Sequence, residues 1–355
     1  MPAKVSFSSP VDWQVFQRHV SEEGPVLISG RVDSPSFIGA VRICIYRQAE
    51  GSSPASVPSE GILQSICATP NFSFTITLPA GGWYTLKIFD ASCLSVGTGR
   101  LKYKVASFKK SVLMGEVKCF GVGEVFVTAG GSNSTNCGEA RQQVKTAHVS
   151  AFTGRRWQPA NDPQPGAQDQ STKGSCWPAF GDSVYSRLKV PIGLVCTGET
   201  GASVDGWQPD INQGGVRISG EQYAYLLGFL KLLGPGGFRA LMWHQGEVDA
   251  YDCATSKEYY SSLVNMIQSI KQEVRWDFPW FVAQASYRPG NGATEAICFA
   301  QRKSWTDGVA LEGPDTDTLT GAYRNQGGYG IHMSEMGQVA LGRMWADKII
   351  GYLEG

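Results

Sequence analysis

The sequence predicts a chain of two parts: an all-β sandwich over residues 1–112, then an α/β domain with a parallel sheet over residues 113–355. In the first part, short β-type runs are separated by clusters of turn residues, with no credible long helix between them. In the second part, apolar strand-like runs alternate with helical patterns, which is typical of a parallel sheet covered on both faces. The length of 355 residues fits two domains.

Five runs in the first part have the composition of strands. Residues 72–78 alternate with period two, so their aromatic and aliphatic side chains share one face, as in a half-buried strand. The Ala-Gly-Gly sequence at 80–82 predicts a hairpin turn, and the Ser- and Pro-rich residues 52–58 predict a loop. The predicted strands cover residues 25–31, 40–46, 72–78, 83–90 and 100–106.

Four apolar runs in the second part predict strands, and four other stretches predict helices. Within residues 256–275, apolar side chains recur at spacings of three and four, which places them on one face of a helix. Ser334, followed by Glu335, has the character of a helix N-cap. The predicted strands cover residues 124–129, 190–196, 240–244 and 280–285, and the helices residues 221–233, 256–275, 293–305 and 334–353.

Charge and composition exclude several classes of protein. Lys and Arg total 31, as do Asp and Glu, so neither a nucleic-acid partner nor an anionic membrane surface is expected. No window approaches the roughly 20 apolar residues of a membrane-spanning helix, and the first residues lack the apolar core of a secretory signal. The compartment and the oligomeric state stay open.

The nine cysteines are scattered and form no CxxC pair, which favours mostly reduced thiols and argues against a zinc site. Neither an HExxH motif nor any three-ligand metal spacing is present. A GxxxxGK phosphate loop and a dinucleotide fingerprint after a strand are also missing. We therefore expect an activity that needs no metal and no cofactor.

Polar loops follow three of the predicted strands, at the carboxyl ends where parallel sheets carry their active sites. Two glycines before the serine at 130–133 (Gly-Gly-Ser-Asn) let the backbone turn sharply and expose a hydroxyl. Residues 196–207, rich in Gly, Thr and Ser, offer backbone N–H groups, and residues 243–249 crowd Trp, His, Gln, Glu and Asp together. The alternatives are plain loops for the first two and a satisfied polar network for the third.

A serine nucleophile needs a base, and the chain has four histidines. His19 lies in the β-rich part, and His148 lies in a polar stretch away from any strand end. His332, just before the last helix, is the best candidate, and His244 at the end of an apolar run is the next. The alternative for His332 is a structural histidine at a helix start.

Taken together, these segments resemble the SGNH hydrolase superfamily, and most closely the sialate O-acetylesterase and carbohydrate esterase family 6 group of sugar deacetylases. Residues 130–133 are similar to its GQSN-type first block, with glycine in place of glutamine. Residues 200–207 are a degenerate second block, and Trp-His-Gln-Gly-Glu at 243–247 matches the third block fully. The DxxH-type last block keeps His332 but has Tyr329 in place of Asp.

The resemblance covers about residues 115–353 and implies a three-layer flavodoxin-like fold with metal-free ester hydrolysis through an acetyl-enzyme. It makes Ser132 the nucleophile and His332 the general base. The implied oxyanion hole consists of the N–H groups of Ser132 and Gly201 and the side-chain amide of Gln245. The implied substrate is an acetylated polysaccharide or sialic acid. The residues expected to bind it are Asn133, Trp207, Trp243 and Tyr323.

A Ser/His pair works best when a carboxylate orients the imidazole, and the phenol of Tyr329 cannot supply that charge. We expect Glu247 to replace the missing Asp, because it follows a strand end two residues after Gln245. Asp249 and Asp317 are the alternatives. The competing interpretation of Glu247 is that it only braces its loop through hydrogen bonds.

Two other functions stay open beside a carbohydrate O-acetylesterase. A carbohydrate-binding protein on a degenerate esterase scaffold is favoured by the missing Asp at position 329, but the intact Ser132, Gln245 and His332 argue against it. A related hydrolase acting on a lipid or aryl ester would need an apolar groove near the site. The role of residues 1–112 is also left open.

Overall fold

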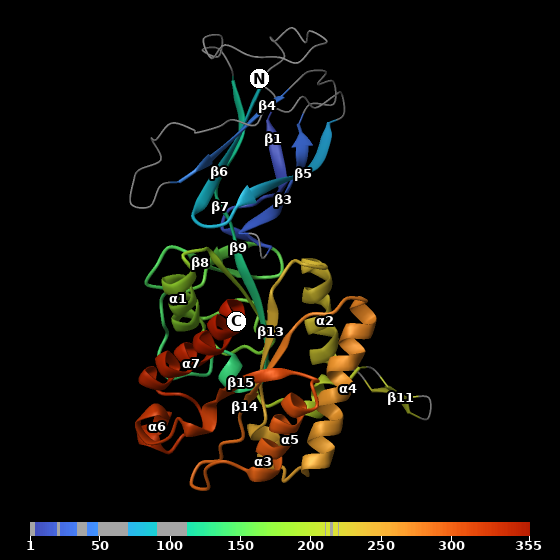
Figure 1. The fold of residues 1–355 in the computed structure, drawn as a ribbon, viewed down its shortest axis with the longest axis vertical. Helices are drawn as coiled ribbons and strands as arrows, with labels where there is room; N and C mark the ends of the chain where they lie inside the picture. Colours follow the sequence, from blue (N-terminus) through green and yellow to red (C-terminus); the bar gives the residue numbers. More distant parts are fainter. Residues whose placement is uncertain are drawn as a thin grey trace. The chain divides into compact units, whose positions relative to one another are not determined.

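The computed structural model divides into two compact units, Met1–Gly123 and Glu124–Gly355 (Figure 1). The boundary predicted between residues 112 and 113 falls where strand β7 (Leu113–Gly130) begins, and this strand runs through the division between the units. The structure describes residues 4–19, 22–33, 41–48, 70–90, 112–209, 211–213, 216–218 and 220–355.

In the first unit, the described residues form strands arranged in two sheets. β3 lies between β1 and β5 with antiparallel pairing, while β6 pairs antiparallel with both β4 and β7, and β2 pairs with β7 in parallel. Residues of both sheets meet in one buried apolar cluster that includes Ile28, Ile43 and Phe120. The strands are β1 (Val5–Ser9), β2 (Gln14–Gln17), β3 (Glu23–Val32), β4 (Val41–Arg47), β5 (Asn71–Pro79) and β6 (Trp83–Asp90).

Four of the five strands predicted for the first part are confirmed as β3, β4, β5 and β6, and β5 buries alternate residues as its period of two requires. The strand predicted at 100–106 and the loop at 52–58 lie outside the described residues. The turn at 80–82 forms with positive φ at Gly81 and Gly82, but the predicted hairpin is wrong. β5 pairs with β3, whereas β6 pairs with β4 and β7, so this turn connects two different sheets.

The second unit is built on a mostly parallel sheet in the order β15-β14-β13-β7-β10-β8-β9, in which only β9 is antiparallel to its neighbour. β10 and β13 are buried along their whole length, as expected of strands covered on both faces. The additional strands of this sheet are β8 (Val149–Phe152), β9 (Trp157–Pro159), β10 (Ile192–Cys196), β13 (Ala240–His244), β14 (Trp280–Gln284) and β15 (Leu311–Asp315).

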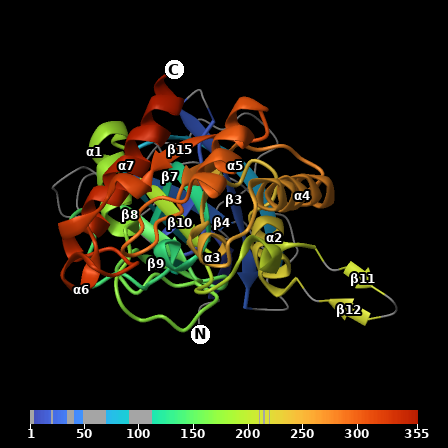
Figure 2. The ribbon, with the colours of Figure 1, turned by 90° about the horizontal axis from the view of Figure 1, so that it is seen from below.

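Helices cover both faces of this sheet (Figure 2). Helices α1 (Trp177–Leu188) and α7 (Glu335–Glu354) pack together on one face. Helices α2 (Glu221–Leu233), α4 (Ser256–Val274) and α5 (Glu295–Thr306) lie on the other, where α4 contacts both of its neighbours. The shorter elements are β11 (Ile211–Gln213), β12 (Val216–Ile218), α3 (Glu247–Tyr251) and α6 (Asn325–Gly328).

The four predicted helices are confirmed as α2, α4, α5 and α7. The predicted cap of α7 is also present, because the hydroxyl of Ser334 accepts a hydrogen bond from the N–H of Gly337 at 3.1 Å. The sequence did not predict α1, whose first turn contains Pro178 and whose interior contains Gly181. Glycine inside a helix lowers the helical propensity of the sequence. In the fold, the packing of α1 against α7 stabilises the helix.

β7 lies where the order of the strands in the sheet reverses. β10 and β8 lie on one side of it, and β13, β14 and β15 lie on the other. In the registers of these pairs, Thr128 of β7 lies opposite Cys196 and Gly130 lies opposite His244. Loops leaving the carboxyl ends of three adjacent strands therefore start at nearly the same level. In open α/β sheets this crevice is where ligands bind.

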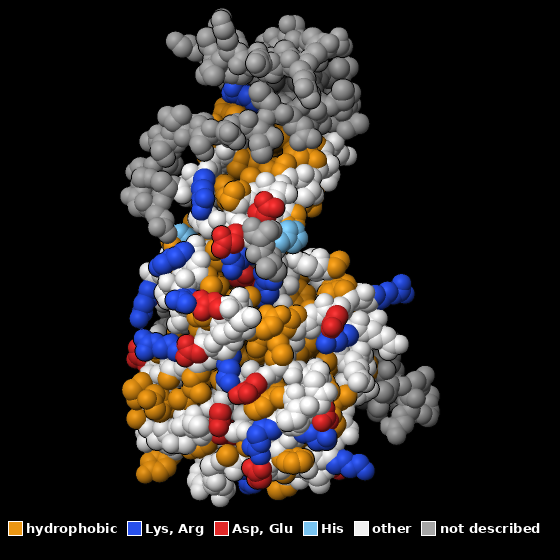
Figure 3. Space-filling view, viewed as in Figure 1, with side chains coloured by type: hydrophobic (Ala, Val, Ile, Leu, Met, Phe, Trp, Pro, Cys, Tyr) orange, Lys and Arg blue, Asp and Glu red, His pale blue; other side chains and the backbone are white. Residues whose placement is uncertain are grey.

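On the face drawn in Figure 3, positive and negative side chains of the second unit are interspersed and do not gather by sign. This distribution agrees with the balanced composition of 31 basic and 31 acidic residues. Among the described helices, none combines the length and apolar character that crossing a membrane requires. The cysteines in the described part of the chain are free thiols.

Candidate active site

Strand β7 brings Ser132 to the carboxyl edge of the sheet. The strand ends at Gly130, where φ is +132° and a Cβ atom would lie 2.1 Å from the carbonyl oxygen of His244. Only glycine fits so close to the neighbouring strand. The N–H of Gly131 then donates to this carbonyl at 2.8 Å, and Ser132 begins a single 3-10 turn with a half-buried side chain.

Asn133 joins three of the loops that carry candidate residues. Its Nδ2 atom donates to Oε1 of Glu247 at 2.8 Å and to the carbonyl oxygen of Ile331 at 3.3 Å. Glu247 lies in the loop after β13, and Ile331 directly precedes His332. Asn133 is buried and its Nδ2 atom is engaged within the protein, so the expected contact with substrate stays a prediction. It holds the site together.

Glu247 begins α3 directly after β13, and its side chain is buried. The Nε2 atom of His244, which is also buried, lies 3.4 Å from Oε1 of Glu247. Burial alone raises the pKa of Glu247, but His244 and the Asn133 amide outweigh it and lower the pKa to about 2. A buried carboxylate is thus ionised across the physiological range. Because His244 is fully buried and its Nε2 atom lies next to Glu247, it is a weaker candidate than His332 for the base that serves Ser132.

His332 lies in the loop before α7 and is mostly buried. Burial lowers the pKa of its imidazole, the negative charge of Glu247 raises it, and the charges of Lys173 and Arg324 lower it. The net result is a pKa below the ordinary value of 6.5. The imidazole is therefore neutral at neutral pH, which is the form that a general base needs. No hydrogen bond occupies its side chain among the residues that the structure describes.

The two alternative acids are engaged elsewhere. Asp249 accepts hydrogen bonds from the side chain of Gln245 and from the N–H of Val204, at 3.0 Å for the latter. Asp317 accepts from the N–H and the hydroxyl of Ser286, at 2.8 and 2.7 Å. Burial raises the pKa of both carboxyl groups. Of these three acids, Glu247 is therefore the one whose charge raises the pKa of His332.

Gly201 lies at the tip of the loop that follows β10. Its φ is +75°, it is exposed, and nothing lies within 4 Å of the position of a Cβ atom. Within the described part of the chain, no acceptor takes the N–H of Gly201 or that of Ser132. Asp169, which no motif in the sequence indicated, fixes this loop by accepting from the N–H of Thr200 at 3.0 Å and from its hydroxyl.

Gln245 is buried, and its amide donors are already engaged. Nε2 donates to the carbonyl oxygen of Ala202 at 3.2 Å and to a carboxylate oxygen of Asp249. An amide nitrogen has two N–H groups, so neither remains for an oxyanion. In this arrangement Gln245 ties the loop after β10 to the loop after β13, and its expected role in an oxyanion hole stays a prediction.

Two of the aromatic residues expected to stack on sugars lie in the core. Trp207 and Trp243 are both 0% exposed and pack edge to face, with ring centroids 5.1 Å apart. A sugar cannot reach either ring, so this prediction is wrong. Tyr323, the third, is 37% exposed, and Tyr329 is 81% exposed, which places its phenol in solvent rather than against His332.

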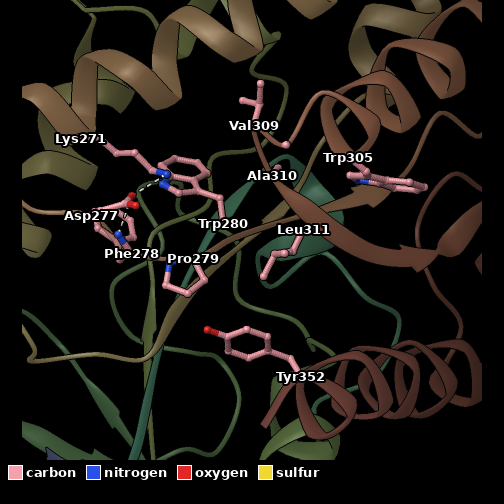
Figure 4. Close-up of a pocket in the computed structure, with 11 residues that line it drawn as sticks. Lys271, Asp277, Phe278, Pro279, Trp280, Trp305, Val309, Ala310, Leu311 and Tyr352 are labelled. Carbon is pink, nitrogen blue, oxygen red and sulfur yellow. Dashed lines mark hydrogen bonds and ion pairs between the residues drawn. The ribbon is translucent and has the colours of Figure 1, made fainter. Parts of the chain in front are cut away.

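A separate hollow of about 450 Å³ lies at the opposite edge of the sheet (Figure 4). Trp280 and Leu311, at the amino ends of β14 and β15, line it together with Trp305 and Tyr352. Because Ser132 follows the carboxyl end of β7, this hollow is not part of the candidate active site. Among the described residues, no group of three or more His, Cys, Asp or Glu side chains is placed to hold a metal ion.

The fold has solved counterparts. A carbohydrate acetylesterase from Xanthomonas citri superposes with a TM-score of 0.52 at 17% identity, over 96% of this chain and 74% of that chain. A protein from Arabidopsis thaliana superposes with a TM-score of 0.51 at 17% identity, over 65% of this chain and 98% of that chain. At these identities the likeness concerns the fold. No curated protein sequence gives a significant match.

The family assignment rests on the sequence of the second unit. Residues 122–351, which include all the candidate residues described above, match the family described as "Carbohydrate esterase, sialic acid-specific acetylesterase". This span is well over half of the 355 residues. The chain therefore belongs to this family of carbohydrate esterases and is a carboxylic ester hydrolase.

Proposed function

We propose that this esterase removes O-acetyl groups from a carbohydrate through an acetyl-enzyme on Ser132. His332 takes the proton of the Ser132 hydroxyl as the oxygen attacks the acetyl carbonyl carbon. The sugar oxygen then leaves with that proton, and the acetyl group stays on the serine. Water, deprotonated by His332, attacks the acetyl-enzyme, and acetate and free Ser132 are released.

The observation that carries this proposal is the pair of hydrogen bonds from Asn133. One amide group, on the residue next to Ser132, reaches both Glu247 and the carbonyl next to His332. Segments more than a hundred positions apart in the chain thus meet beside the serine. A positioned acid, base and nucleophile are the elements of a serine esterase, whatever their order in the chain.

Glu247 takes the role of the acid in this proposal. Its charge acts on His332, and its pKa of about 2 keeps it ionised while the imidazole carries a proton during the reaction. A negative charge that acts on the imidazole stabilises the imidazolium formed when His332 accepts the serine proton. Tyr329 need not supply an acid, which agrees with its exposure to solvent.

The oxyanion in this proposal is stabilised by the N–H groups of Ser132 and Gly201. Both groups lack an acceptor in the described structure, and both lie on loops at the carboxyl edge of the sheet. Each such donor lowers the barrier by roughly 3–4 kcal/mol in comparable sites. Asp169 contributes indirectly, because it fixes the loop that presents Gly201.

For the substrate, we infer an acetylated polysaccharide or an acetylated sialic acid. The family description names sialic acid, and the partly exposed ring of Tyr323 is the aromatic surface expected to contact a sugar. For the front unit, we infer a β-sandwich accessory domain, because two sheets of antiparallel character share one apolar cluster. Its boundary is proposed between residues 112 and 113.

Acetate release from acetylated xylan, acetylated sialic acid and acetylated bacterial polysaccharides tests this function. We expect release from at least one of these substrates, undiminished by a chelator, and no release by Ser132→Ala. The matched control is Ser203→Ala, which changes a serine on the neighbouring loop whose side chain caps nothing. Sugar binding without acetate release would favour the carbohydrate-binding alternative, and loss of activity in chelator would reject the serine mechanism.

A further inference from the structure

Arg324 is a charged side chain buried inside the catalytic unit at 2% exposure. Arginine is almost never buried so completely unless it is paired. Here its guanidinium is paired with carbonyl groups. Nε donates to the oxygen of Leu319 at 2.6 Å, Nη1 to that of Ile331 at 2.8 Å, and Nη2 to that of Thr316 at 3.1 Å.

The same guanidinium lies over the ring of Tyr287, 4.0 Å from the ring centroid. No carboxylate in the described structure is within ion-pair distance of it, and the charges of Glu247 and Asp317 act on it from farther away. Burying a cation without a contacting carboxylate is costly. The planar guanidinium of Arg324 holds the three carbonyl groups in fixed directions, which the ammonium group of a lysine cannot do.

The carbonyl of Ile331 links Arg324 to the site. It accepts from Arg324 on one side and from Nδ2 of Asn133, at 3.3 Å, on the other. The neighbouring backbone is tied as well, because the N–H of Asn325 donates to the oxygen of His332 at 2.9 Å. The peptide just before the base is therefore held from both the nucleophile loop and the arginine.

We propose that Arg324 is the positioning residue for His332: its guanidinium binds the carbonyl groups of Thr316, Leu319 and Ile331 and so fixes the backbone that leads to the imidazole. This proposal rests on the proposed function, since it assigns the base to His332. A displacement of a catalytic group by about 1 Å can lower a rate on the order of 10²-fold. Arg324 does not touch the substrate in this proposal and acts through the backbone.

The charge of Arg324 adds a second effect. Three charged groups act on His332: Glu247 raises its pKa, while Lys173 and Arg324 lower it. Removing the cation should therefore raise the pKa of the imidazole, whereas replacing arginine by lysine should not. Geometry and charge can thus be separated with two variants at one position.

The test compares Arg324→Lys and Arg324→Met with the wild-type full chain, using hydrolysis of p-nitrophenyl acetate and the pH profile of kcat/KM. Arg239→Lys is the matched control, because Arg239 is a partly buried arginine that pairs with Glu124 near the opposite end of β13. We expect both Arg324 variants to lower kcat on the order of 10–100-fold with KM changed by less than about threefold. The acidic limb of the profile should move to higher pH only in Arg324→Met.

A folded Arg324→Lys enzyme with kcat within about twofold of wild type would overturn the proposal. If neither Arg324 variant folds, Tyr287→Leu decides, since it removes the ring beneath the guanidinium and leaves the arginine in place. We expect this variant to lose at least about threefold in kcat, and full kcat would overturn the proposal. An inactive wild-type enzyme would reject the proposed function itself, which distinguishes the two failures.

Discussion

The Nε2 atom of His244 lies 3.4 Å from Oε1 of Glu247, and both side chains are buried. The two residues stand at the end of β13 and the start of α3, three positions apart. The interaction with His244 is the largest of those that lower the pKa of Glu247, and it opposes the effect of burial, which raises that pKa. A buried carboxylate of this kind is stabilised in its charged form, which suits it to act on an imidazolium.

Replacing Glu247 by glutamine keeps its size and removes the charge. We expect Glu247→Gln to lower kcat by a factor on the order of 10²–10⁴ with little change in KM, as when an interaction made only in the transition state is lost. The measurement is steady-state hydrolysis of a small acetyl ester. Asp162→Asn is the control, because Asp162 lies outside the loop from residue 316 to residue 331 and its carboxyl group accepts from the N–H and the hydroxyl of Ser175. Nearly full kcat in a folded Glu247→Gln enzyme would reject the assignment.

The pH profile of kcat/KM reports the ionisation of the base in the free enzyme. His332 must be neutral to accept the serine proton, so activity rises as the pH passes its pKa. Because burial and the charges of Lys173 and Arg324 lower that pKa, we expect the acidic limb to have its midpoint below 6.5. A midpoint above 6.5 would contradict the described surroundings of the imidazole.

The stability of the fold should also depend on Glu247. A carboxyl whose folded-state pKa lies near 2, against an ordinary 4.5, contributes stability above pH 4.5 and loses it as the pH falls towards 2. Between about pH 6 and about pH 3, we expect the wild type to lose on the order of 2 kcal/mol more unfolding free energy than Glu247→Gln. Denaturant unfolding at both pH values measures this difference. Equal losses in the two proteins would show that Glu247 is not held ionised by the fold.

The boundary proposed between residues 112 and 113 can be tested with the fragment 113–355, which keeps all the proposed catalytic residues. We expect activity on p-nitrophenyl acetate, because every described contact of the site lies within the second unit. Solubility should fall, since Met114, Val117, Phe120 and Val122 are buried in the first unit and would be exposed. A folded but inactive fragment would mean that the front unit contributes to the site.

Local sequence patterns were sufficient to predict much of the fold. The period-two burial of β5 and the periodic apolar face of α4 are properties of a few adjacent residues. Sheet membership is not local. The glycines at 81 and 82 predict a turn, but which strands pair on either side of it depends on the whole unit, so the hairpin prediction failed.

The site shows the same limit. Ser132 and Glu247 could be placed at strand ends from the sequence, because the carboxyl edge of a parallel sheet is a general rule. Whether an aromatic ring near that edge faces substrate or core depends on packing, and Trp207 and Trp243 pack against each other. Asp169 had no signal in the sequence, since its role depends on a contact with Thr200 in another loop.

In the proposed mechanism, Ser132 carries the acetyl group during turnover. The most direct measurement is to mix the enzyme with excess p-nitrophenyl acetate, quench within one turnover and locate the added acetyl group by peptide mass analysis. The proposed mechanism predicts an acetyl group on the peptide that contains Ser132, absent from Ser132→Ala, whose kcat falls on the order of 10³–10⁶-fold. Acetyl transfer to another residue, or turnover by Ser132→Ala at the wild-type rate, would contradict it.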